Sequence, residues 1–206
     1  MLVVVRMMGL IVVHLRWARP TLRVIFWHVG QGDATLVQLP NGKSLLVDSG
    51  PAWYAGRSNS RSIIATLDKL DIDAIDLLIH THPHADHIGS SKTLIEQVRV
   101  RQIAHSGYPY ASNIHSEWLE MAQSMELPVL MLKQGETLNL DPRVLIRVLS
   151  PSIRPYSSSV NNSSITLHLQ YDATAVLLMG DAEIELEKEL IATYDSTLAA
   201  QIIKIG

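Results

Sequence analysis

The side chains of this sequence that could do chemistry are concentrated at residues 82–87, which read HPHADH. Three imidazoles and a carboxylate lie within six positions, and no packing requirement explains such a density of polar groups. Imidazole nitrogen and carboxylate oxygen are the ligands that zinc and similar divalent ions take in proteins. The segment therefore predicts a metal centre. It also favours hydrolysis, because a divalent ion lowers the pKa of bound water to about 7.

The elements expected on either side place this segment between a strand and a helix. Residues 74–79 form an apolar run of the strand type, and residues 90–98 have the spacing of a helix with one apolar face. A loop between them leaves the backbone free to aim several side chains at one point. His80, at the end of the apolar run, is interpreted as a strand residue and not as a ligand.

Spacing within the loop divides its ligands into two pairs. His82 and His84 alternate, so their imidazoles can converge on one ion. Asp86 and His87 are adjacent and diverge, which suits a second ion. Two ions a few ångströms apart would hold the attacking and leaving groups of a hydrolysis in line.

Two further carboxylates stand at the ends of predicted strands. Asp181 follows an apolar strand and a glycine, and it is also suited to cap a helix that begins near Glu183. Asp48 ends another apolar strand, and we interpret it as the residue that orients a ligand histidine. The alternative for Asp48 is a turn residue. Asp33, which follows a glycine turn, is interpreted as a turn residue.

A loop rich in Ser, Pro and Asn covers residues 150–164. Within it, Asn162 and Ser163 are predicted to contact substrate or metal-bound water. An Asx-type turn is the alternative for this pair.

These motifs together resemble those of the metallo-β-lactamase superfamily. Residues 82–87 are similar to its His-x-His-x-Asp-His signature, residues 45–50 to its early strand ending in Asp and Gly, and residues 176–181 to its later strand ending in Asp. Shorter matches resemble the hydrolase-like domain of ComEC-type competence proteins, which bring DNA into bacterial cells. They lie at residues 29–34, 161–164 and 180–183.

The resemblance implies a fold and a ligand set. The fold would be of the α+β class, a four-layer αββα sandwich, and the cofactors would be two divalent metal ions, zinc or manganese. His82 and His84 would bind the first ion, Asp86 and His87 the second, and Asp181 would bridge them. Asp86 among the ligands and Asp48 behind them are the residues expected to act in catalysis.

Two departures from the family pattern affect this ligand set. The third histidine of the first metal is missing, as in ComEC-like sequences generally, and His105 is a better candidate for it than His115. ComEC-like domains have a Lys-Val-Gly, similar to the Lys-Ile-Gly at residues 204–206, that is followed at once by His-His-Gly, and that motif is absent here. We therefore expect a domain over residues 21–206 that is truncated at the C-terminus and short of one ligand. Whether this chain is active as it stands is left open.

Composition excludes several other kinds of site. The chain has 206 residues, enough for one domain, of which 47% are apolar and 18% charged. It has no cysteine, so a thiolate metal site, a disulfide and a thiol nucleophile are excluded. With a net charge of −3, the chain lacks the basic character that dominates nucleic-acid affinity. Bound divalent cations would nevertheless add positive charge locally.

The first 20 residues form an apolar leader. Residues 2–15 are apolar apart from Arg6 and His14, and this run is shorter than the roughly 20 residues that span a bilayer. We interpret the leader as the end of a membrane helix, with an N-terminal strand or a disordered segment as the alternative. The resemblance implies a bacterial membrane location, with this domain on the extracytoplasmic side and the membrane-embedded channel portion of the parent protein as its partner.

Three functions are consistent with these observations. The leading one is a metal-dependent nuclease that hydrolyses single-stranded or duplex DNA during DNA uptake. The second keeps the metal but acts on a small ester, thioester or lactam. The third is a non-catalytic domain of a DNA-uptake channel.

Overall fold

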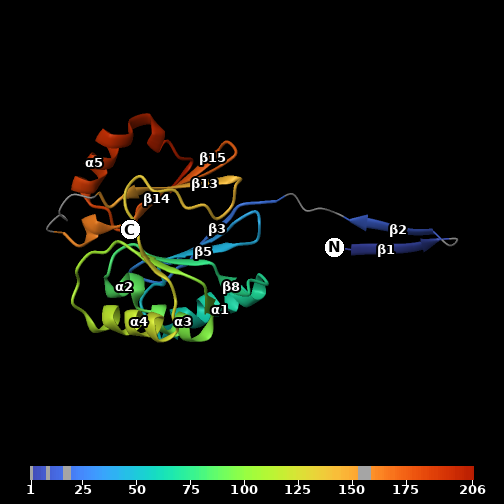
Figure 1. The fold of residues 1–206 in the computed structure, drawn as a ribbon, viewed down its shortest axis with the longest axis horizontal. Helices are drawn as coiled ribbons and strands as arrows, with labels where there is room; N and C mark the ends of the chain where they lie inside the picture. The colour runs from blue at the N-terminus through green and yellow to red at the C-terminus, as the bar shows by residue number, and fades with distance from the viewer. Residues whose placement is uncertain (1, 8–9, 16–19, 153–158) are drawn as a thin grey trace.

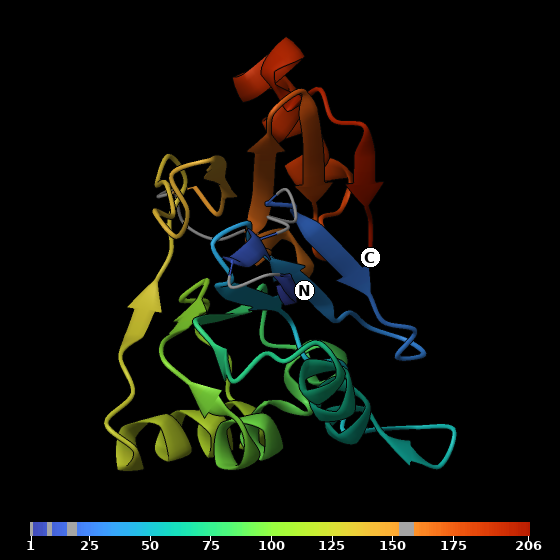
Figure 2. The same ribbon diagram turned by 90° about the vertical axis from the view of Figure 1, so that its right-hand side faces the viewer.

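Two β-sheets lie face to face and helices cover both outer faces, so the layers follow the order α, β, β, α (Figure 1). The same order is seen in the view turned by 90° (Figure 2). This computed structural model describes residues 2–7, 10–15, 20–152 and 159–206. The architecture confirms the αββα sandwich predicted from the sequence.

The first sheet has six strands in the order β12-β11-β9-β5-β4-β3. Strands β3, β4 and β5 pair antiparallel, and β5, β9, β11 and β12 pair parallel. Parallel neighbours need a long crossover, and helices supply it here on the outer face of the sheet. The bounds are β3 Arg23–Phe26, β4 Thr35–Gln38, β5 Ser44–Val47, β9 Leu77–His80, β11 Ile103–His105 and β12 Val129–Met131. The helices are α1 Asn59–Lys69, α2 Ala85–Ile88, α3 Ser91–Gln97 and α4 Asn113–Ser124.

The second sheet has four strands in the order β13-β14-β15-β16. Its pairs are antiparallel except the last, β15 with β16, which is parallel and is connected through α5. The bounds are β13 Val144–Ser150, β14 Thr166–Tyr171, β15 Thr174–Leu178, α5 Ile184–Tyr194 and β16 Ile202–Lys204. Short elements complete the described chain: β6 Trp53–Tyr54, β7 Arg57–Ser58, β8 Ala74–Ile75, β10 Arg99–Val100 and the 3-10 turns Asn161–Ser163 and Asp195–Leu198.

Strand β5 shows how the sequence builds both core layers. Leu45 and Val47 point into the core between the two sheets, whereas Leu46 points into the core between the first sheet and its helices. Successive side chains of a strand alternate between faces, so a continuous apolar run fits only a strand that is covered on both sides. The same reasoning applies to β9, whose end carries the predicted metal segment.

Two expected elements differ in the structure. Residues 136–140, whose alternating apolar residues are typical of a strand, form a single bridge, Thr137 with Arg147, and Leu140 N–H turns back to donate to the carbonyl of Leu138. The predicted loop at residues 82–87 contains one turn of helix, α2, because His84 accepts hydrogen bonds from the backbone N–H groups of His87 and Ile88.

The apolar leader contains two paired β-strands in the structure. Strands β1 (Leu2–Met7) and β2 (Leu10–Leu15) pair antiparallel over their whole length. Among the described residues, no helix is both long and apolar enough to cross a bilayer. The interpretation of residues 1–20 as the end of a membrane helix stays a prediction.

Candidate metal centre

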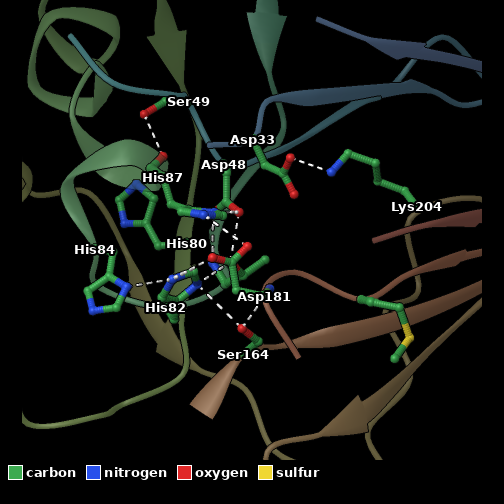
Figure 3. A network of polar contacts seen from close by, with 12 residues as sticks. Asp33, Asp48, Ser49, His80, His82, His84, His87, Ser164, Asp181 and Lys204 are labelled. Carbon is green, nitrogen blue, oxygen red and sulfur yellow. Dashed lines mark hydrogen bonds and ion pairs between the residues drawn. The ribbon is translucent and has the colours of Figure 1, made fainter. Parts of the chain in front are cut away.

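Three of the predicted ligands, His82, His87 and Asp181, meet where strands of both sheets end (Figure 3). Asp48 follows β5 and His82 follows β9, and because these strands are parallel their carboxyl ends lie at the same edge. Asp181 follows β15 of the second sheet, so the centre takes residues from both sheets. Functional groups of such sheets collect beyond the carboxyl ends of the strands.

Three of the predicted ligands form the close group of the centre: His82, His87 and Asp181, which each offer one ligand atom within 4.8 Å of the other two. Nε2 of His82 is 3.8 Å from Oδ2 of Asp181, and Nε2 of His87 is 3.2 Å from Oδ1. Both imidazoles are buried, and the carboxylate is about a quarter exposed, at 24%. The group is therefore open to solvent on the side of Asp181.

One atom of this group tests whether a metal ion fits. Nε2 of His87 is buried and has no hydrogen-bond partner among the described residues, although a carboxylate oxygen lies 3.2 Å away. Buried polar atoms are rarely left without a partner. A nitrogen and an oxygen that face each other without a hydrogen bond suit a divalent cation with N and O ligands. The residues of the group therefore fit a metal ion.

Asp48 holds His87 from behind. Its carboxylate accepts hydrogen bonds from the Thr81 backbone N–H at 2.8 Å and the Thr81 hydroxyl at 2.7 Å, and it lies 2.8 Å from Nδ1 of His87. Asp48 also has a positive φ of 58°, a conformation that costs a non-glycine residue about 1–2 kcal/mol. This arrangement leaves Nε2 of His87 pointing at Asp181, and the role of Asp48 in orienting a metal ligand stays a prediction.

Burial and neighbouring charges give the two histidines opposite protonation. Burial, together with the charge of His87, lowers the pKa of His82 to about 4, so this imidazole is neutral at pH 7. Burial acts in the same direction on His87, but Asp48 and Asp181 outweigh it and raise its pKa to about 10. A divalent cation bound by His87 would compete with protonation of this imidazole.

Ser164 is a residue of the centre that the sequence did not identify. Its hydroxyl lies 3.3 Å from Nδ1 of His82 and accepts a hydrogen bond from the backbone N–H of Asp181 at 3.1 Å. Gly180 packs against it so closely that a Cβ at this position would lie 2.9 Å from the hydroxyl oxygen, and φ there is 57°. Ser164 thus fixes both His82 and the backbone that carries Asp181.

The predicted substrate residues lie one and two positions earlier and have other partners. The amide oxygen of Asn162 accepts from the backbone N–H of Glu183 at 2.9 Å, next to the start of α5. The hydroxyl of Ser163 donates to the carbonyl of Val160 at 2.6 Å. Both residues are buried, and a contact of either with substrate stays a prediction.

His84 and Asp86 lie outside the close group. Nδ1 of His84 is 3.1 Å from Nε2 of His82, and its ring packs edge-on against Tyr110. Asp86 belongs to α2, where Gly32 packs against its backbone: a Cβ at Gly32 would lie 1.9 Å from the Asp86 carbonyl oxygen. The ligand roles of both residues stay predictions.

A second close group contains Asp33, Asp48 and His87. As expected of a turn residue, Asp33 accepts a backbone hydrogen bond at its carbonyl, from Gly50 N–H at 2.7 Å. Its carboxylate, however, faces the centre and forms an ion pair with Lys204. Burial raises the pKa of Asp33, and the ammonium of Lys204 opposes that shift. The sequence pattern revealed neither the position of this carboxylate nor its partner.

His105 and His115, the two candidates for a third histidine, pack around Trp118 instead. Their ring centroids lie 5.8 Å and 5.2 Å from that of the tryptophan. Neither belongs to a close ligand group of the described chain, and a ligand role for His105 stays a prediction. His80 contacts Trp118 as well and hydrogen-bonds Ser91 at 2.7 Å, in keeping with its interpretation as a strand residue.

Residues 27–201 match the profile of the metallo-β-lactamase superfamily. The chain belongs to this superfamily. It is accordingly a metal-dependent hydrolase by class, and the superfamily implies binding of a divalent metal, for which the close group provides ligands.

The chain is also similar to two longer bacterial proteins. It is 26% identical over 190 residues to ComE operon protein 3 of Bacillus subtilis, which covers 86% of the chain and 24% of that protein. It is 34% identical over 97 residues to Recombination protein 2 of Haemophilus influenzae, which covers 47% of the chain and 12% of that protein. The chain thus spans about a quarter or less of these relatives.

The fold also matches a solved structure. The diiron β-hydroxylase CmlA from Streptomyces venezuelae is similar with a TM-score of 0.51 and 17% identity, over 84% of this chain and 33% of that one. At this level of identity the similarity shows the metallo-β-lactamase fold alone.

Proposed function

We propose that this domain hydrolyses DNA phosphodiesters during DNA uptake, with two divalent ions, zinc or manganese, bound at the centre. The observation that carries the proposal is the group of His82, His87 and Asp181, drawn from both sheets with one buried nitrogen left without a hydrogen bond. Similarity to ComEC-like relatives supports DNA as the substrate. Single-stranded and duplex DNA are both candidates.

Under this proposal each residue of the centre has a defined task. His82 and His84 would hold one ion, Asp86 and His87 the other, and Asp181 would contact both. When bound, such ions supply a water acidic enough to attack at neutral pH and polarise the scissile oxygen. Asp48 keeps the ring of His87 aimed at Asp181, and Ser164 keeps the backbone of Asp181 beside His82. The chain thereby holds its ligands in place before an ion arrives.

The segment after β16 also packs on the centre. Gly206 lies against Asp181, because a Cβ there would lie 2.1 Å from Oδ1 of the carboxylate.

Location is part of the same proposal. ComEC-like proteins bring DNA into bacterial cells, so we place this domain at the bacterial membrane, on the extracytoplasmic side. The membrane-embedded channel portion of the parent protein would be its partner.

A nuclease assay tests the proposed activity. The protein is incubated with single-stranded and duplex DNA in zinc or manganese, with EDTA and Asp181→Asn as controls. Cleavage that requires the ion and Asp181 is the expected result. Absence of cleavage of either DNA in both metals would refute the proposal.

A small-molecule hydrolase is the second candidate, and the net charge of −3 favours it. Added salt distinguishes the two, because binding to DNA weakens steeply with salt and binding to a neutral ester does not. For the third candidate, the non-catalytic domain, calorimetric metal titration is decisive: tight binding of zinc or manganese excludes it.

A further inference from the structure

The charged groups of the centre are mostly carboxylates, and one lysine side chain lies beside them. Asp33, Asp48 and Asp181 contribute carboxylates, whereas Lys204 is the only lysine or arginine among the described residues that forms an ion pair with any of them. An anionic substrate that approaches these carboxylates is repelled unless cations offset them. The ammonium of Lys204 is thus a candidate for substrate contact from the protein itself.

The fold brings this lysine to the centre from the sheet opposite the histidines. Lys204 ends β16, and its backbone carbonyl accepts from Met179 N–H at 3.0 Å, two residues before Asp181. From there its side chain reaches across to Asp33, in the loop before β4 of the first sheet (Figure 3). The ammonium therefore contacts the carboxylate of Asp33. One oxygen of that carboxylate lies within 4.8 Å of ligand atoms of Asp48 and His87.

These contacts take up only part of the hydrogen-bonding capacity of the Lys204 ammonium. A lysine carries three N–H donors. Lys204 directs one to Asp33 and one to the carbonyl of Ile205 at 2.6 Å, and the described residues offer no partner for the third. The side chain is 28% exposed, so this donor has access to solvent at the edge of the centre.

We propose that Lys204 binds the anionic oxygen of the substrate's phosphodiester, with Asp33 holding the ammonium at the edge of the metal centre. This inference rests on the proposed function and adds a residue that recognises the substrate. No bond forms or breaks at Lys204. It favours phosphate esters over neutral esters, because only the former carry the charge that it contacts.

Binding of inorganic phosphate to the manganese-loaded protein, measured by calorimetry, tests the proposal without any need for cleavage. Lys204→Gln is expected to weaken phosphate binding about 10-fold or more, the effect of losing one charge-assisted hydrogen bond. Lys92→Gln is the matched control, because it removes the same charge from a surface pair with Glu117. It should leave phosphate affinity unchanged.

A double variant separates the lost cation from the carboxylate left behind. Lys204→Gln alone leaves Asp33 buried without its partner, whereas Asp33→Asn with Lys204→Gln removes both charges. If Lys204 binds the anion, the double variant recovers at most the part of the loss that is due to repulsion by the unpaired Asp33, and it stays weaker than the natural protein. Full recovery of phosphate affinity in the double variant would overturn the proposal. Unchanged affinity in Lys204→Gln, a loss explained by weaker manganese binding, or no phosphate binding by the natural protein would do the same.

Hydrolysis of small esters gives a second test of Lys204, and this test does not depend on whether the protein cleaves DNA. With bis(4-nitrophenyl) phosphate and 4-nitrophenyl acetate as substrates, Lys204→Gln should lower kcat/KM for the charged diester and spare the neutral ester. An equal loss on both would assign Lys204 a purely structural role. Absence of DNA cleavage would refute the nuclease proposal and leave the phosphate-binding result to decide on Lys204.

Discussion

Replacement of Asp48 is the sharpest test of how the centre is organised. Asp48→Ala removes the acceptor for two groups of Thr81 and the contact of Nδ1 of His87, all of them buried. The backbone keeps its positive φ of 58°, which alanine tolerates poorly and glycine tolerates well. Asp48→Gly therefore removes the same carboxylate without the backbone strain.

The expected magnitudes follow from these contacts. Removing one partner of a buried charge pair costs about 3–5 kcal/mol, so Asp48→Ala should lower the free energy of unfolding by that amount in metal-free protein. Asp48→Gly should be about 1 kcal/mol less destabilising relative to Asp48→Ala, because it relieves the left-handed conformation. Asp48→Asn keeps the shape and tolerates this φ, and it should mainly weaken metal binding, by about 10–100-fold.

Urea unfolding in EDTA measures the stability of each variant, and calorimetric titration with manganese measures metal affinity. The reasoning is refuted if Asp48→Asn binds manganese as tightly as the natural protein, because the carboxylate then does not orient His87. It is also refuted if Asp48→Gly is less stable than Asp48→Ala, because the positive φ is then not a source of strain.

Three further predictions follow from the centre. Gly180→Ala should lower the free energy of unfolding by about 1–3 kcal/mol in a urea titration, because φ is 57° and the new methyl would lie 2.9 Å from Ser164; an unchanged midpoint would contradict the packing described. Manganese at 100 times its Kd should add about 2.7 kcal/mol of stability, seen as a higher Tm, and His87→Ala should abolish that gain; an equal gain in the variant would exclude His87 as a ligand. In EDTA, stability should fall as pH rises from about 6.5 towards 10, because the pKa of His87 is about 10 in the folded protein and about 6.5 in the unfolded chain; the interaction is fully present below pH 6.5, and a flat profile in urea titrations would contradict it.

The fold was predictable because its strands and helices carry strong local patterns. Both the continuous apolar run of β5 and the helical spacing of α4 are visible within a dozen residues. Residues 136–140 had the composition of a strand, but their pairing depends on where Leu140 turns back, and hydrophobicity does not encode that.

The centre was predictable where its ligands are neighbours in sequence, and less so where they meet only in space. His82 and His87 belong to one motif, and Asp181 is marked by its place after an apolar strand. Lys204 and Asp33 are 171 positions apart, and no local signal links them. Ser164 was missed because the Asn and Ser residues just before it carry the same turn-forming signal, and only the start of β14 decides which one reaches His82.

The two sheets of the sandwich also set the distance between ligands of the centre. His87 follows a strand of the first sheet and Asp181 follows a strand of the second. The apolar layer between the sheets therefore sets the opening into which an ion must fit. A larger or smaller side chain at Val47 or Leu178 would alter that opening, because packed interiors pass on changes in volume instead of absorbing them. Preference for one cation radius over another is therefore adjustable from hydrophobic positions that never touch the ion.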